Sequence, residues 1–191
     1  MGQGAKIALA ILGVLAVIGI MVGGWVVGQY NMIITMDEHV KAQWAQVDNQ
    51  LKRRYDLIPN LVETVKGYAA HEKGVFENIA QARTQYFQAK TPAQKIQASQ
   101  QLEGFLSRLL VLKETYPQLK ANESFLKLQD SLEGTENRIS VERMRYNETV
   151  QTLNSYRRSF MGRFIAALAG VEEAKYFETP AGEKEAPKVK F

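Results

Sequence analysis

The chain has 191 residues, no cysteine, a formal net charge of +4 and 46% hydrophobic residues. The absence of cysteine excludes disulfide scaffolds, cysteine-based zinc sites, iron–sulfur clusters and thiol catalysis. The charge pattern argues against nucleic-acid binding, because Lys and Arg are interspersed with Asp and Glu and no aromatic–basic module is present. The hydrophobic residues are unevenly spread, since one apolar run near the N-terminus takes a large share of them and leaves a remainder of soluble character.

A membrane helix is the first predicted element, over residues 7–28, after a short N-terminal tail of residues 1–6. These 22 residues include no charged, amide or hydroxyl side chain, and as a helix they would extend about 33 Å, enough to cross a hydrocarbon core of about 30 Å. A cleaved signal peptide is the alternative, but the run is longer than a signal's apolar region and no small-residue cleavage site follows it. Trp25 and Tyr30, at the end of the run, are typical interface anchors.

Glycine spacing indicates how this helix would pack. Two G-x-x-x-G pairs, Gly19 with Gly23 and Gly24 with Gly28, would let two helix backbones approach closely in a bilayer. We therefore expect the membrane helix to self-associate. Chance is the alternative explanation for one such pair, because glycine is common in membrane helices.

The rest of the chain is predicted to be helical, because no alternating strand pattern persists and no Asn-Gly or Asp-Gly hairpin signal occurs. A first stripe of apolar residues steps by three and four positions until Pro59, which is expected to break or kink the helix; its members are Val40, Trp44, Val47, Leu51, Tyr55 and Ile58. A second stripe repeats every 3.5 residues, as in left-handed bundles and coiled coils; it comprises Leu61, Val65, Tyr68, Glu72, Val75, Ile79, Ala82 and Tyr86.

Two further long helices follow. Thr91 can cap a helix in which Pro92 takes the first position, and Pro117 is expected to end it. The longest helix is predicted to begin after a cap at Asn122 or Ser124 and to carry apolar residues at helical spacing for about 36 residues.

The predicted fold is all-α: an N-terminal transmembrane helix followed by an elongated antiparallel bundle of three to four long helices over residues 29–170. Helices with single apolar stripes must bury those stripes against one another, which favours such a rod-like bundle. A short helix is expected after Phe164, and residues 171–191 are expected to form a largely flexible C-terminal segment.

Two sequence blocks resemble the LemA family: residues 45–72, AQVDNQLKRRYDLIPNLVETVKGYAAHE, and residues 116–150, from YPQLKANESF to RYNETV. The resemblance covers essentially the whole chain, with Tyr30-Asn31 ahead of the blocks and KYF...APKVKF at the end. It implies a bacterial single-pass inner-membrane protein with a long helical bundle and an unsettled molecular activity. Many members carry Phe-Pro where this chain has Phe160-Met161-Gly162, so we expect the fourth helix to run on towards Phe164.

The resemblance and the charges differ on orientation. The family's usual description places the short N-terminus outside the cell. The charge rule leans towards a cytoplasmic N-terminus, because Lys6 and the terminal amine precede the span while Asp37, Glu38 and Lys41 follow it.

No catalytic or metal-binding pattern is found. A di-iron bundle needs Glu-x-x-His pairs, but Met36 stands three residues before His39 and Tyr68 three before His71. His71 is interpreted as a solvated or bundle-edge residue beside Glu72. The chain also lacks the H-E-x-x-H, G-x-S-x-G, P-loop and dinucleotide motifs, so it is predicted to be no enzyme and to need no cofactor.

Polar residues within the resembling blocks have two interpretations; the candidates are Arg53, Arg54, Glu136, Arg138 and Arg143. If they face inward, they form a polar layer that defines helix register and oligomeric state. If they face outward, the four arginines form a docking surface for an acidic partner segment or a lipid headgroup.

The sequence therefore predicts a membrane-anchored, non-enzymatic helical scaffold that contacts membrane lipids and forms homo-oligomers. The alternative is a regulator or substrate-presenting adaptor of a membrane enzyme such as a membrane protease, with another membrane protein as its partner.

Overall fold

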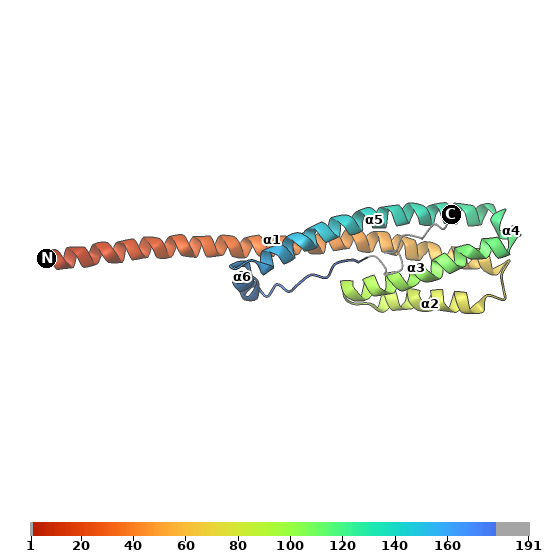
Figure 1. Ribbon diagram of the computed structural model, residues 1–191, viewed down its shortest axis with the longest axis horizontal. Coiled ribbons are helices and arrows are strands. Elements are labelled where there is room, and N and C mark those ends of the chain that lie inside the picture. Colours follow the sequence, from red (N-terminus) through yellow and green to blue (C-terminus); the bar gives the residue numbers. More distant parts are fainter. Residues whose placement is uncertain (1, 179–191) are drawn as a thin grey trace, which may run out of the picture. The chain divides into compact units, whose positions relative to one another are not determined.

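The computed structural model describes residues 2–178, and all regular secondary structure in this range is helical (Figure 1). The all-α prediction is therefore confirmed. The helices of this range are α1 (Gln3–Lys66), α2 (Lys73–Gln88), α3 (Pro92–Thr115), α4 (Pro117–Lys120), α5 (Glu123–Arg158) and α6 (Gly162–Ala169). They divide into two compact units. Unit 1 lies within Met1–Lys41 and Thr149–Ala174, and unit 2 within Ala42–Glu148 and Lys175–Phe191, so that α1 and α5 contribute to both.

Helix α1 is continuous where the sequence predicted a break or kink. Pro59 lies inside the helix and is exposed, while Tyr55, Ile58 and Leu61 around it are buried. Proline removes one backbone hydrogen bond and crowds the preceding turn. The predicted break is wrong, because burial of the apolar face on both sides of Pro59 offsets this local cost, and the alternative of a kink stays a prediction.

The chain leaves the helical path only after Lys66. The amide of Gly67 donates to the Glu63 carbonyl at 3.4 Å and that of Ala69 to the Val65 carbonyl at 2.9 Å, which closes the last turn of α1. The predicted second stripe is thus divided between the end of α1 and α2. Glu72, the polar residue that interrupts the stripe, lies in the connection and immediately precedes α2.

Helices α2 and α3 pack side by side as an antiparallel hairpin in unit 2 (Figure 1). The start of α3 is confirmed as predicted, with Pro92 in its first turn and Thr91 as its cap. The Gln94 amide donates to the Thr91 hydroxyl at 3.3 Å, and the Thr91 amide donates to the Gln94 side chain at 3.3 Å. This reciprocal pair satisfies two amides that the helix start leaves free. Helix α3 ends at Thr115, ahead of Pro117 as expected.

Helix α5 has the predicted length of 36 residues, and the Asn122 side chain caps it by accepting from the Phe125 amide at 2.9 Å. The expected continuation towards Phe164 is wrong, because α5 ends at Arg158. At the turn that follows, a Cβ on Gly162 would collide with the carbonyl oxygen of Tyr156, so only glycine fits this close approach. The Gly162 amide donates to the Ser159 hydroxyl at 3.0 Å, and α6 begins there.

A glycine also terminates α6. Gly170 has a φ of 67°, and its amide and that of Val171 donate to the carbonyls of Ala167 and Ala166 at 3.3 and 3.0 Å. This pattern is a Schellman motif, in which the left-handed residue redirects the chain.

Each unit has its own apolar core. In unit 2 the two predicted stripes contribute Val47, Leu51, Tyr55, Ile58, Leu61, Val65, Ile79, Ala82 and Tyr86, and α3 and α5 add residues that include Leu102, Leu106, Leu109, Phe125, Leu132 and Ile139. The core of unit 1 is smaller and contains Ile33, Val40, Val150, Leu153, Ile165, Ala166 and Val171.

The segment after α6 is extended along α5. In unit 1 the Asn154 side-chain amide exchanges two hydrogen bonds with the Ala174 backbone, at 2.8 and 3.1 Å. In unit 2 that of Asn147 does the same with Phe177, at 3.0 and 2.8 Å. The expected largely flexible segment, residues 171–191, thus has its first eight residues in the described range, and residues 179–191 lie outside it.

Candidate functional site

The first half of α1 presents an apolar surface that the described chain does not cover. This part of α1 is long and apolar enough to cross a membrane, and none of its most apolar 18-residue stretch is buried. Trp25 and Tyr30, the predicted interface anchors, are 47% and 37% exposed. Contiguous apolar surface of this extent marks a membrane or a partner. The surface is consistent with a membrane protein.

The four glycines predicted to pack membrane helices lie on this uncovered part of α1. A Cβ added at Gly19, Gly23, Gly24 or Gly28 would meet no atom within 4 Å. Packing within the described chain therefore gives no reason for glycine at these positions, and self-association through them stays a prediction.

Arg54 and Glu136 form an ion pair in unit 2 between α1 and α5. The Arg54 guanidinium donates to a Glu136 carboxylate oxygen at 2.7 Å, and the side chains are 11% and 36% exposed. The Arg54 Nε is buried and has no hydrogen-bond partner among the described residues. A mostly buried ion pair of this kind contributes little net stability but is costly to break. Arg54 therefore faces inward and Glu136 lies at the edge of the interior, and a role of this pair in helix register or oligomeric state stays a prediction.

Arg53 and Arg138 instead face one open groove of about 530 Å³ between α1 and α5 in unit 2. Both arginines are exposed. The remaining lining comes from Asp56, Leu57, Asp130, Ser131, Gly134 and Thr135. Guanidinium groups bind carboxylates and phosphates through paired hydrogen bonds, and here the two arginines share the groove with the carboxylates of Asp56 and Asp130. The five predicted polar residues thus separate into an inward pair and an outward pair, with Arg143 apart from both.

Arg143 contacts the extended segment after α6. Its guanidinium carbon lies 5.6 Å from the centre of the Phe177 ring, a cation–π distance, and the Phe177 side chain is 4% exposed. The side chain is therefore engaged within unit 2.

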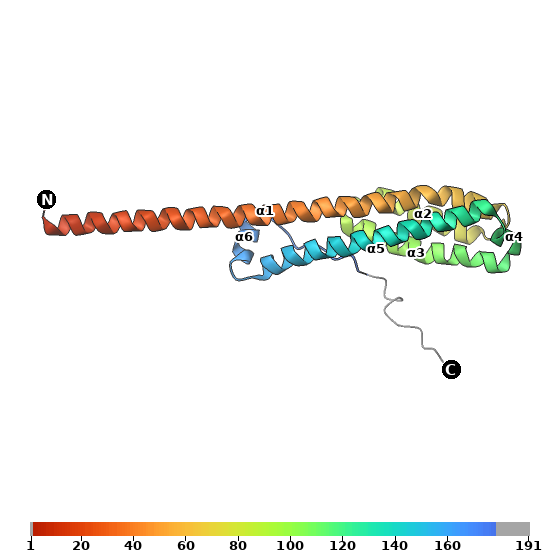
Figure 2. The ribbon, with the colours of Figure 1, turned by 90° about the horizontal axis from the view of Figure 1, so that it is seen from above.

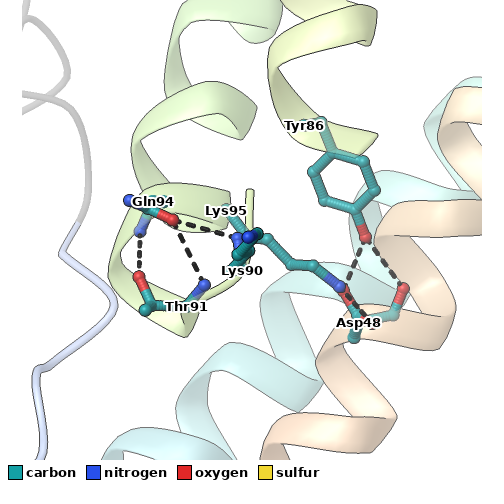
Figure 3. A network of polar contacts seen from close by, with 6 residues as sticks. All are labelled: Asp48, Tyr86, Lys90, Thr91, Gln94 and Lys95. Carbon is teal, nitrogen blue, oxygen red and sulfur yellow. Dashed lines mark hydrogen bonds and ion pairs between the residues drawn. The ribbon is translucent and has the colours of Figure 1, made fainter. Parts of the chain in front are cut away.

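A polar network at Asp48 joins three helices of unit 2 (Figure 3). The Asp48 carboxylate accepts from the Tyr86 hydroxyl at 2.7 Å and from Lys95 Nζ, which lies 2.7 Å from both of its oxygens. Tyr86 also stacks on Tyr55, with ring centres 4.0 Å apart. Burial, and secondly the hydrogen bond to Asp48, raise the pKa of Tyr86 above its usual value, so its hydroxyl stays protonated and donates.

The sequence predictions missed this network. Tyr86 was assigned to an apolar stripe by its spacing, and nothing local connects Asp48 with Lys95, 47 residues further along the chain. The one available signal was the polar end of Tyr86, since a buried tyrosine hydroxyl usually has a partner.

Within residues 2–178, no group of three or more Asp, Glu or His side chains is arranged to hold a metal ion. His71 is exposed, and its neighbour Glu72 accepts a hydrogen bond from the Tyr116 hydroxyl at 3.4 Å. The groups assembled in unit 2 are therefore an internal polar network, an ion pair and a groove lined by two arginines and two aspartates.

Comparison with known proteins identifies the family. Residues 43–191 match the LemA family. The chain is 27% identical to magnetosome proteins MamQ 1 and MamQ 2 of Paramagnetospirillum magneticum, over 96% of this chain and 76% of each relative. It is 25% identical to magnetosome protein MamQ of Magnetospirillum gryphiswaldense, over 81% of this chain and 67% of that protein. The resemblance seen in the sequence is confirmed, and the chain belongs to the LemA family.

Proposed function

We propose that this protein is a membrane-anchored, non-enzymatic helical scaffold of the bacterial inner membrane that forms homo-oligomers. The observation that carries the proposal is the first half of α1, whose large apolar side chains are exposed while those of both unit cores are buried. A helix with apolar residues on all sides is stable only inside a protein core or a bilayer. The description of the MamQ relatives as magnetosome proteins supports a role in a cellular assembly.

The open glycines supply a route to assembly. With 3.6 residues per turn, Gly24 lies about 140° around the helix from Gly19, so the two G-x-x-x-G pairs occupy different faces. Each pair would admit another helix backbone at close range, because nothing in the described chain lies within 4 Å of these positions. Two faces would allow each membrane helix to contact two neighbours, as an extended scaffold requires.

Light scattering coupled to size exclusion of the detergent-solubilised chain tests this proposal. We expect an oligomer that becomes smaller in Gly19→Leu/Gly23→Leu and in Gly24→Leu/Gly28→Leu. Val22→Leu is the matched control, because it adds leucine at the same depth on a third face and should leave the mass unchanged. A wild-type chain that is monomeric at micromolar concentration would refute the scaffold.

The arginine-lined groove favours a second candidate function, presentation of an acidic segment of a partner to a membrane enzyme. Arg53 and Arg138 lie on facing helices and are exposed, so an acidic segment would bind them in competition with Asp56 and Asp130 of the same groove. Fluorescence anisotropy with labelled poly-glutamate is a direct test. Binding should be lost in Arg53→Gln/Arg138→Gln and kept in Arg108→Gln, which changes an exposed arginine of α3. Equal binding by both variants would remove this candidate.

A further inference from the structure

Helix α6 and the turn before it carry an exposed cluster of large apolar side chains, which we call the α6 patch. Its members are Phe160, Met161, Phe164 and Leu168, exposed by 70%, 42%, 59% and 67%. The opposite face of α6 is buried in unit 1 and consists of Gly162, Ile165 and Ala166. Of the large apolar residues of α6, Ile165 is buried while Phe164 and Leu168 face outward, whereas a helix at a protein–water boundary has a polar outer face.

In unit 1 a hydrogen bond between Gln29 and Tyr156 shows where the α6 patch lies along α1. Gln29 directly follows Gly28, and its side-chain oxygen accepts from the Tyr156 hydroxyl at 2.9 Å. Helix α6 begins six residues after Tyr156, and both views show it beside α1 (Figure 1, Figure 2). The patch therefore lies next to the point where α1 changes from apolar to polar.

The charges around the patch suit the same location. The Arg163 guanidinium lies 5.5 and 5.8 Å from the ring centres of Phe160 and Phe164, and exposed Arg158 ends α5. Arginines beside exposed aromatic rings are typical of segments that lie in the headgroup region, where the rings reach the acyl boundary and the guanidinium groups meet lipid phosphates. The acidic residues of unit 1 nearest in sequence to the span, Asp37 and Glu38, are both paired with Lys41 at 2.8 Å. Glu172 and Glu173 are exposed and follow α6 only after the chain has turned at Gly170.

We propose that the α6 patch is a second membrane contact, which inserts into the interface of the bilayer that α1 spans and binds acyl chains and anionic headgroups. This inference rests on the proposed membrane anchoring of α1. Interfacial helices bury their apolar face about 5–10 Å into the headgroup and acyl boundary. The two contacts together would hold unit 1 against the membrane surface through α6 as well as through α1.

Site-directed spin labelling tests the contact, and the natural absence of cysteine allows single labels in the full chain. The labelled variants are Leu168→Cys in the patch, Val14→Cys in the apolar run and Val111→Cys on α3, all at exposed positions. The protein is reconstituted into vesicles of equimolar phosphatidylcholine and phosphatidylglycerol. Collision rates are then measured with oxygen, which concentrates in lipid, and with a water-soluble nickel chelate.

We expect the labels at positions 14 and 168 to collide several-fold more often with oxygen than with the nickel chelate, and the label at 168 to lie at the shallower depth. The label at position 111 should collide more often with the nickel chelate. Phe160→Ser/Phe164→Ser should move the label at 168 towards water and leave the label at 14 in lipid. A lipid-exposed label at 14 with a water-exposed label at 168 overturns the patch contact while the anchor stands. Low collision rates with both reagents at 168 indicate a protein partner or a second copy and also overturn it. A water-exposed label at 14 overturns the anchor and the patch contact together.

Discussion

Replacing Asp48 with alanine removes the acceptor shared by Tyr86 and Lys95 in the centre of unit 2. The hydroxyl of Tyr86, a residue only 2% exposed, would lose a charge-assisted hydrogen bond of 2.7 Å. Such a bond contributes about 1.5–3 kcal/mol. The Lys95 pair contributes about 0.5–1 kcal/mol, because its side chains are 24% and 31% exposed and solvent screens them. We therefore expect Asp48→Ala to lower the free energy of unfolding of unit 2 by about 2–4 kcal/mol.

Denaturant unfolding of the detergent-solubilised full chain measures this loss. Trp44 reports on unit 2, because its ring packs edge-on against Tyr146 at 5.4 Å, and Trp25→Phe in every variant removes the other tryptophan signal. Asp48→Asn is the control, since its side-chain oxygen still accepts from Tyr86 while the ion pair is lost, and it should cost about 1 kcal/mol. A loss below about 0.5 kcal/mol for Asp48→Ala, or an equal loss for both variants, would refute this account of the network.

Three further predictions concern other contacts. Glu136→Gln leaves the Arg54 charge without its partner and should lower the free energy of unfolding by about 1–3 kcal/mol, less than for a fully buried pair because Glu136 is 36% exposed. Arg54→Met/Glu136→Met should recover most of this loss in denaturant unfolding. A double variant as unstable as the single one would contradict this expectation. Gly162→Ala forces a collision with the Tyr156 carbonyl and should increase proteolysis between α5 and α6, while Gly134→Ala, where a Cβ meets no atom within 4 Å, should not; equal cleavage would show that the turn yields easily. Burial raises the pKa of Tyr55 and Tyr86 above the usual value of 10, so their contribution to stability is complete below about pH 10 and is lost as the pH rises through their folded-state pKa values. Alkaline unfolding followed by circular dichroism should therefore be steep, less so in Tyr55→Phe, and an unchanged profile in that variant would contradict the burial effect.

Sequence patterns predicted the helices of unit 2 well where the cause is local. Thr91 with Gln94 and Asn122 with the Phe125 amide are caps formed within three residues. Residue type and spacing predicted Thr91 as a cap and gave Asn122 as one of two candidates, with Ser124. The stripe from Val40 to Ile58 was likewise predicted correctly, since all its members except Trp44 are buried. Helical periodicity alone determines which residues share a face. The end of α5 was misplaced, since the collision at Gly162 depends on backbone geometry that composition does not reveal.

The candidate site was only partly predictable. Arg53 and Arg54 are neighbours in the sequence, yet one lines an open groove and the other is paired with Glu136, because successive residues on a helix point about 100° apart and only the position of α5 decides which is covered. Asp48 and Lys95 could not be connected from sequence, since their contact requires α1 and α3 to pack together.

By itself, the sequence determined the all-α class, the apolar run at residues 7–28, the extent of α3 and the starts of α3 and α5, because composition and interactions between residues three or four positions apart decide them. The tertiary structure decided the rest. Continuity of α1 through Pro59, the separation of the arginines and the outward direction of Phe164 depend on which faces other helices bury, and that energy comes from contacts between residues far apart along the chain.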